Sequence, residues 1–256
     1  MRGYLIETYG APTSHRIHDM DDLVPGPDEV LIDNQAIGLN YPDALMVMGK
    51  YQKRPEPPFR PGRDCAGVVR QVGQNVTGFK PGDLVVAQVF SGAFSEQVLA
   101  PVSRAFHRPE AVSPIDAAGA ITVFNTAFVA VSIRAGVKAG DRVVVTGAAG
   151  GVGLAAVQLA NALGAHVLGV VSSEQKAALV RAGGADALIL KDRDEETLKQ
   201  AFKDQVRSHW GDDRGADVVI DTVGGAMFIA GLRCLGFAGR MVVVGFASGD
   251  IGSAKA

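Results

Sequence analysis

This 256-residue chain has few cysteines and no excess of positive charge. The only thiols, Cys65 and Cys234, are too few for a disulfide-built fold or a four-cysteine zinc site. A net charge of −2 without a basic stripe gives no electrostatic footprint for nucleic acid. The N-terminus has no basic segment leading into an apolar one, and no run approaches the roughly 18 consecutive apolar residues of a membrane span. We therefore expect a cytoplasmic protein without a nucleic-acid or membrane partner.

The pattern along the chain changes near residue 117. Before that point, short β-like runs are separated by glycine and proline, which favours an antiparallel, barrel-like domain. These runs cover residues 29–37, 65–72, 84–89 and 94–100. Afterwards apolar strands alternate with helical segments, the pattern of a doubly wound parallel sheet. Its strands are predicted at residues 142–146, 166–171, 187–190, 217–220 and 240–245. We predict two domains, residues 1–117 and 118–256, with the boundary inside a helix that begins near Ser113.

The most informative segment, residues 141–164, reads DRVVVTGAAGGVGLAAVQLANALG. An apolar β-branched run leads into a glycine turn and then an apolar-periodic helix, the order that a pyrophosphate-binding βα unit requires. Ala148, Gly150 and Gly153 occupy the three positions of the G-x-G-x-x-G fingerprint. Gly150 lets the backbone approach phosphate, and Gly153 lets the helix pack closely on its strand. We predict a dinucleotide site at this turn; an ordinary strand-to-helix turn is the alternative.

Several segments together carry a family resemblance. They read GLNYPD (38–43), PGRDCAGVV (61–69), VGQNVTGFKPGDLV (72–85) and GAAGGVG (147–153). In this order and spacing the chain resembles the medium-chain dehydrogenase/reductase superfamily, and within it the zinc-free quinone oxidoreductases related to zeta-crystallin. The resemblance implies an α/β protein with an N-terminal GroES-like β-barrel catalytic domain, a Rossmann domain that binds NADPH, and a substrate cleft between them.

The chain departs from the family at its end. The family's Rossmann sheet has a sixth strand, after which the chain returns to complete the catalytic domain, whereas only 11 residues follow Gly245 here. The sequence therefore resembles a C-terminally shortened member in which that strand and the return segment are absent. A homodimer is an open alternative to the monomer.

The positions that hold zinc in dehydrogenase relatives differ in this chain. Those relatives use a cysteine near position 40 and Gly-His-Glu near position 63, whereas this chain has Asn40 and Gly62-Arg63-Asp64. Zinc needs three or four converging ligands, so the sequence predicts no metal site. Cys65, within an apolar strand, is expected to be a small buried hydrophobe.

Without a metal to polarise it, the substrate must already be activated. Quinones and α,β-unsaturated carbonyls meet this need, since hydride addition gives a hydroquinone or an enolate that a few hydrogen bonds stabilise. Asn40 and Tyr41, in the loop that replaces the zinc-ligand loop, are the candidate catalytic donors; a turn before Pro42 is the structural alternative. Asp43 is expected to order this loop.

Cofactor preference is read at the end of the second Rossmann strand. NAD enzymes place an acidic residue about 20 positions after the glycine turn, but this chain reads VVSSEQK at residues 170–176. We therefore predict NADPH, with Ser172 or Ser173 hydrogen-bonded to the 2′-phosphate and Lys176 neutralising it. Alternatively, Ser172 caps the next helix through its spacing to Gln175, and Lys176 is an ordinary surface lysine.

The remaining predicted cofactor contacts come from the glycine turn and from the resemblance. Those of the turn are Ala149, Gly150, Gly151 and Val152. The resemblance implies that Thr126 lies beside the nicotinamide and that its pocket is lined by Phe246, Ala247 and Ser248. A mid-helix threonine bonded to its own backbone is the alternative for Thr126. Asp221 is expected to anchor a turn.

These features leave three functions open. The leading one is an NADPH-dependent reductase of a quinone or an α,β-unsaturated carbonyl that works without metal. A close variant is an enoyl- or acryloyl-thioester reductase, although no basic pocket for a coenzyme A phosphate is recognisable. The third is a non-catalytic NADPH-binding protein.

Overall fold

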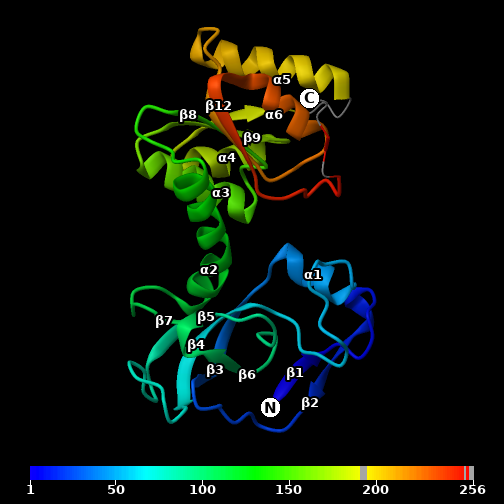
Figure 1. The fold of residues 1–256 in the computed structure, drawn as a ribbon, viewed down its shortest axis with the longest axis vertical. Helices are drawn as coiled ribbons and strands as arrows, with labels where there is room; N and C mark the ends of the chain where they lie inside the picture. Colours follow the sequence, from blue (N-terminus) through cyan, green and yellow to red (C-terminus); the bar gives the residue numbers. More distant parts are fainter. Residues whose placement is uncertain (191–194, 251, 254–256) are drawn as a thin grey trace. The chain divides into compact units, whose positions relative to one another are not determined.

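The computed structural model describes residues 1–190, 195–250, 252 and 253, and the chain divides into two compact units (Figure 1). Unit 1 comprises Met1–Thr122 and unit 2 comprises Val123–Ala256. The sequence predicted the boundary after Ala117, in the same helix in which the division is found.

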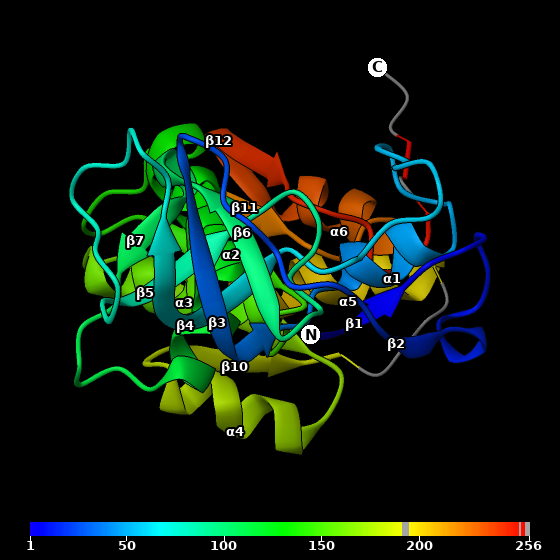
Figure 2. The same ribbon diagram turned by 90° about the horizontal axis from the view of Figure 1, so that it is seen from below.

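Unit 1 is built on an antiparallel five-stranded sheet in the order β6-β3-β4-β5-β7, whose strands lie side by side in Figure 2. Its strands are β3 (Glu29–Gly38), β4 (Asp64–Val72), β5 (Leu84–Gln88), β6 (Gln97–Pro101) and β7 (Ala105–His107). Alternate residues such as Val30 and Ile32 are buried in one core, as the period-two geometry of a strand requires. The smaller elements of the unit are β1 (Arg2–Leu5), η1 (Pro12–Ser14), β2 (Arg16–Asp19), α1 (Tyr41–Val47) and η2 (Val102–Arg104).

Helix α2 (Pro114–Phe128) begins where the sequence predicts. Ser113 Oγ accepts from the Asp116 N–H at 3.0 Å, which caps the first turn. The helix continues as the π-helical turn η3 (Val129–Arg134). Together they span 21 residues with a mean hydropathy of 1.5 in their most apolar window, long and apolar enough to cross a membrane. Core helices have the same composition, and α2 places Ala118 and Ala127 in buried clusters, so the helix alone assigns no membrane location.

Unit 2 contains a parallel five-stranded sheet in the order β10-β9-β8-β11-β12, which confirms the predicted doubly wound sheet. The strands are β8 (Arg142–Thr146), β9 (His166–Val171), β10 (Asp186–Ile189), β11 (Ala216–Asp221) and β12 (Leu235–Val243). The helices are α3 (Gly151–Ala162), α4 (Glu174–Ala182), α5 (Glu195–Trp210) and α6 (Ala226–Cys234).

Both faces of this sheet are covered (Figure 1). Val143 and Val145 of β8 pack with residues of α3 and α4, whereas Val144 between them packs with residues of α5 and α6. All three valines are fully buried. Burial on two faces explains why this strand is a continuous apolar run rather than an alternating one.

Candidate functional site

Strand β8 and helix α3 are joined by the predicted glycine turn. Gly147 turns the chain with φ of 60°, and Gly150 is the N-cap of α3 with an extended backbone. A Cβ atom on Gly153 would lie 2.3 Å from the Gly147 carbonyl oxygen, so only glycine lets the helix approach the strand this closely. On Gly150 the nearest atom to a Cβ would be that same oxygen at 3.3 Å. Gly153 therefore serves the packing, and Gly150 faces open space.

The first turn of α3 presents free backbone donors. Within the described part of the chain, no acceptor takes the N–H groups of Gly151, Val152 and Gly153. Gly150 is exposed and has no side chain with which to cap them. Unpaired N–H groups and the positive end of the helix dipole together form an anion-binding site. Ala149 is the half-buried residue before this turn, so all four predicted pyrophosphate residues lie at the carboxyl end of β8.

The residues predicted to bind the 2′-phosphate lie at the carboxyl end of β9. Lys176 Nζ donates to Ser172 Oγ at 3.1 Å, and both side chains are exposed. The helix cap predicted for Ser172 belongs instead to Ser173, whose Oγ accepts from the Lys176 N–H at 3.4 Å. Helix α4 begins at Glu174, one residue later than the spacing from Ser172 to Gln175 requires. The carboxylate of Glu174 forms an ion pair with Arg181 of the same helix.

The loop after β12 packs against the turn after β11. The N–H of Ala247 donates to Thr222 O at 3.2 Å, and the N–H of Ser248 donates to Val223 O at 3.0 Å. Phe246 is 40% exposed next to this turn. Asp221, fully buried, accepts from Thr146 Oγ1 at 2.5 Å and from the Val223 N–H at 3.0 Å, as expected of a turn anchor.

Helix α2 passes close to the first turn of α3. A Cβ on Gly151 would lie 2.9 Å from Val123 Cγ1. Thr126 is half-buried, one helical turn beyond Val123. The structure therefore places the predicted cofactor residues of unit 2 after the carboxyl ends of β8, β9 and β12 and places Thr126 on helix α2.

The predicted catalytic donors lie at the start of α1 in unit 1. Asn40 is the N-cap of α1, and its own N–H donates to Asp43 Oδ2 at 2.8 Å. Asp43 thereby orders the loop, as expected, while its Oδ1 is buried without a hydrogen-bond partner. Burial raises the pKa of Asp43 to about 6, although the Asn40 N–H opposes this shift. Tyr41 is 59% exposed, and its hydroxyl makes no hydrogen bond to another described residue.

A second buried carboxylate holds the Asn40 side chain. Asn40 Nδ2 donates to Asp64 Oδ2 at 2.9 Å, and Thr122 Oγ1 donates to Asp64 Oδ1 at 2.7 Å. Gln88 Nε2 in turn donates to Thr122 Oγ1 at 2.6 Å. Burial raises the pKa of Asp64, and the hydrogen bonds from Thr122 and Asn40 oppose this shift. We call Asp43, Asp64, Thr122 and Gln88 the Asn40 clamp.

Two positions that correspond to zinc ligands in dehydrogenase relatives are joined by a hydrogen bond in this chain. Asn40 and Asp64 are hydrogen-bonded partners, and within the described residues no three His, Cys, Asp or Glu side chains are grouped as a metal site would require. Cys65 is fully buried, as expected, and Cys234 is 1% exposed. Burial raises the pKa of each thiol to about 12.

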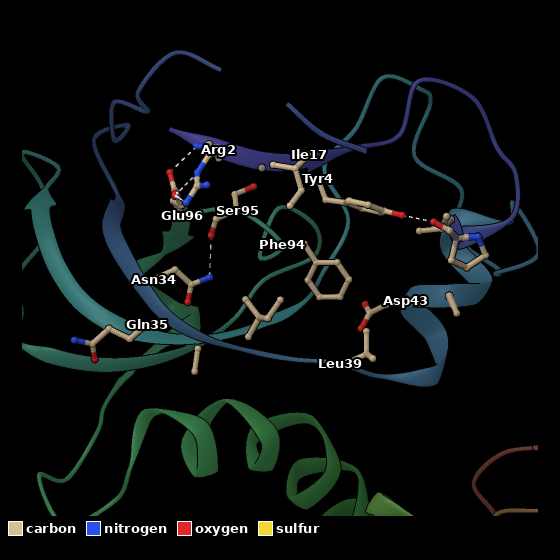
Figure 3. A pocket seen from close by; sticks show the side chains of 16 residues that line it. Arg2, Tyr4, Ile17, Asn34, Gln35, Leu39, Asp43, Phe94, Ser95 and Glu96 are labelled. Atoms are coloured by element: carbon tan, nitrogen blue, oxygen red, sulfur yellow. Dashed lines mark hydrogen bonds and ion pairs between the residues drawn. The ribbon is translucent and has the colours of Figure 1, made fainter. Parts of the chain in front are cut away.

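A pocket of about 660 Å³ adjoins the Asn40 loop within unit 1 (Figure 3). Its walls are mostly apolar and include Ile37, Leu39 and Phe94, while Asp43 reaches it from α1. Both Asp43 Oδ1 and Ser95 Oγ are buried atoms without a hydrogen-bond partner. Because these two atoms are buried, they add no polar surface, and the pocket offers mainly apolar contact.

Three members of the Asn40 clamp are not predicted by the sequence. Asp64 stands out there only as a replaced zinc position, and nothing singles out Thr122 or Gln88. The one local signal is the Asn-x-x-Asp spacing of residues 40–43, which matches a helix-capping box. The contacts among positions 40, 64, 88 and 122 depend on tertiary structure and leave no local pattern.

Two protein-family models match the chain. Residues 26–110 match the alcohol dehydrogenase GroES-like domain, and residues 151–254 match the zinc-binding dehydrogenase model. The chain is 38% identical to quinone oxidoreductase-like protein 2 of Rattus norvegicus over 89% of its own length, and it spans 63% of that protein.

The chain is also similar to quinone oxidoreductases, one of them with a known structure. The chain is 32% identical to the quinone oxidoreductase of Homo sapiens over 96% of its length, covering 73% of that protein. It also resembles the crystal structure of the Escherichia coli quinone oxidoreductase complexed with NADPH, with a TM-score of 0.90 and 29% identity. That likeness covers all of this chain and 76% of the bacterial one.

Proposed function

Since the chain belongs to the zinc-free quinone oxidoreductases of the medium-chain dehydrogenase/reductase superfamily, we propose that it is an NADPH-dependent reductase of quinones or α,β-unsaturated carbonyls. The observation that carries this proposal is a pair of features suited to phosphate groups at the carboxyl ends of β8 and β9. One is the free N-terminus of α3, and the other is Lys176 held beside Ser172. A dinucleotide with a 2′-phosphate would use both.

The residues present fit NADPH rather than NADH. Gly150 is exposed, and the space where a Cβ atom would lie is open except for the Gly147 carbonyl oxygen. This open space leaves room for a pyrophosphate at the α3 N-terminus. Ser172, Ser173 and Lys176 would hold the 2′-phosphate, and Glu174, which follows Ser173 in the sequence, is paired with Arg181. When bound, NADPH would supply a hydride to the substrate and be oxidised to NADP⁺.

The groups of unit 1 would handle the negative charge that hydride addition leaves on the substrate oxygen. Asn40 Nδ2 has one hydrogen engaged with Asp64 and a second that is available to donate. The exposed Tyr41 hydroxyl is a further donor, and it or solvent would deliver the proton that completes a hydroquinone or a saturated carbonyl. These donors stabilise an enolate or phenolate but do not activate an unactivated ketone, which favours quinones and enones.

The proposal predicts turnover that depends on both reactants. Purified protein should oxidise NADPH in the presence of a quinone or an enone, as followed by the loss of absorbance of the reduced nicotinamide. An acyl-thioester substrate tested alongside distinguishes the enoyl-thioester alternative. NADPH binding without turnover of any of the three substrate classes would contradict a reductase and leave a non-catalytic binding protein.

Lys176 provides a test of the cofactor choice. We expect Lys176→Ala to weaken NADPH binding about 10- to 100-fold, the loss of one charge-assisted hydrogen bond, and to leave NADH binding unchanged. Titration of each nucleotide by fluorescence measures both affinities. Lys138→Ala, at an exposed lysine before the amino end of β8, is the matched control and should change neither. An equal loss for both nucleotides would mean that Lys176 does not read the 2′-phosphate.

A further inference from the structure

The proposed function leaves one feature of the Asn40 clamp in unit 1 unexplained, the buried carboxylate of Asp64. Asp64 begins β4, where it lies between Gly38 of β3 and Gln88 of β5 in the strand register. It is 1% exposed, and both of its carboxylate oxygens accept hydrogen bonds, from Asn40 and from Thr122. A buried carboxylate is costly to keep without such partners, so its position is tightly determined.

The position of Thr122 is determined as well. A Cβ on Gly38 would lie 2.2 Å from Ala118 O, so the glycine lets the end of β3 and helix α2 approach each other closely. Thr122 follows Ala118 by one helical turn and meets Asp64 on one side and Gln88 on the other. The series Gln88, Thr122, Asp64, Asn40 therefore links two strands, a helix and the catalytic loop of unit 1.

We propose that Asp64 and Thr122 are positioning residues for Asn40, which fix its side-chain amide so that one Nδ2 hydrogen remains free for the substrate oxygen that gains charge. This inference rests on the proposed function, because it assigns a purpose to the orientation of Asn40. An amide held only by its own χ angles would spend part of its time with the carbonyl oxygen toward the substrate. A carbonyl in that place repels a developing oxyanion, whereas a preoriented N–H stabilises it.

The test compares substitutions that remove or retain the acceptor at position 64. Asp64→Leu is similar in size and removes both acceptor oxygens, so kcat should fall about 10- to 100-fold with little change in KM for NADPH. Asp64→Asn keeps one acceptor oxygen and should retain kcat within about threefold. Thr122→Val and Thr122→Ser form a second pair, in which only the valine removes the donor to Asp64 and lowers kcat.

A double-mutant cycle separates positioning from a direct role. If Asp64 acts through Asn40, the Asn40→Ala/Asp64→Leu variant should be no slower than Asn40→Ala alone. The Asn40 side-chain amide can be observed by NMR after selective ¹⁵N labelling of asparagine. The Nδ2 hydrogen bonded to Asp64 should exchange with solvent slowly in the wild type and quickly in Asp64→Leu and Thr122→Val. This signal and thermal melts of each variant distinguish loss of orientation from loss of fold.

The outcomes distinguish this inference from the function on which it rests. If the wild type turns over no quinone, enone or thioester, the proposed function fails and the positioning role fails with it. If the wild type is active and folded Asp64→Leu or Thr122→Val is equally active, only the positioning role is overturned. Additive losses in the cycle would overturn it as well, because Asp64 would then act independently of Asn40.

Discussion

Replacing Gly150 by alanine is expected to weaken binding of both NADPH and NADH about 10- to 100-fold while leaving the fold intact. The new Cβ meets only the Gly147 oxygen at 3.3 Å, and the extended backbone of Gly150 suits alanine. On the exposed side, the methyl group occupies the space that a pyrophosphate needs in order to reach the α3 N–H groups. The loss corresponds to one or two charge-assisted hydrogen bonds and falls on both nucleotides because both carry the pyrophosphate.

The same substitution at Gly153 should act on stability instead. Its Cβ would lie 2.3 Å from Gly147 O and 2.9 Å from Ala148 Cα, and these backbone atoms can yield only if α3 moves away from β8. We expect a loss of about 1–3 kcal/mol or more in the free energy of unfolding. Gly119→Ala, at an exposed helix position with nothing within 4 Å of the new Cβ, is the matched control and should be neutral or slightly stabilising.

Nucleotide titration and thermal unfolding of the three variants provide the measurement. Unchanged nucleotide affinity in folded Gly150→Ala would contradict the assignment of the turn to pyrophosphate. A loss for NADPH alone would place the effect at the 2′-phosphate, where Lys176 is expected to act.

The second large effect is on the pH dependence of stability. The pKa of Asp43 is raised by burial from 3.8 to about 6, so the folded protein holds this proton at pH values where the unfolded chain has released it. The protonated carboxyl contributes its full stability below pH 4, and that contribution is lost as the pH rises through 6. A shift of this size corresponds to about 3 kcal/mol.

Asp43→Asn removes the ionisation but keeps an oxygen that can accept from the Asn40 N–H. We therefore expect the unfolding free energy of the variant, relative to the wild type, to rise by about 3 kcal/mol between pH 4 and pH 7.5. Urea titrations at several pH values, followed through the backbone amide signals of β4, measure this difference within unit 1. A difference that stays flat with pH would show that Asp43 titrates as an exposed carboxyl does.

Asp83→Asn is a control of opposite sign. The Lys80 side chain holds the pKa of Asp83 below its ordinary value, so its contribution is present above that range and lost in acid. Removing this carboxylate should lower stability at neutral pH relative to acid, whereas removing that of Asp43 should raise it.

The strands that carry the core were predictable because their burial appears in the local pattern. The runs at β8 and β9 are apolar and β-branched, and they match the predicted bounds of residues 142–146 and 166–171. Strands β1 and β2 were missed because RGYL and RIHD are short and half polar, without a run of apolar or alternating residues. Strand β12 begins at Leu235, whereas the sequence predicts its start at residue 240. The prediction starts too late because the glycines of LGFAG indicate a turn rather than a strand.

The candidate site was predictable where its residues lie close together in the sequence. The glycine turn is written in contiguous residues, and so its place before α3 followed from the sequence. Of two adjacent serines, either one has a side chain that can cap a helix, and only the structure assigns that cap to Ser173. The hydrogen bonds of Asp64 join residues up to 58 positions apart, so no window of sequence contains them.

The burial of both cysteines has a consequence for a protein whose proposed substrates are electrophiles. Quinones and enones add readily to thiolates, so an accessible low-pKa cysteine in such a protein would be alkylated by its own substrate. Burial raises the pKa of each thiol to about 12, so both remain protonated at pH 7. Cys65 and Cys234 are also shielded from contact by the core around them. If the chain reduces this thiol-reactive class of molecule, as proposed, it offers that class no thiol nucleophile, and we expect turnover without covalent self-inactivation.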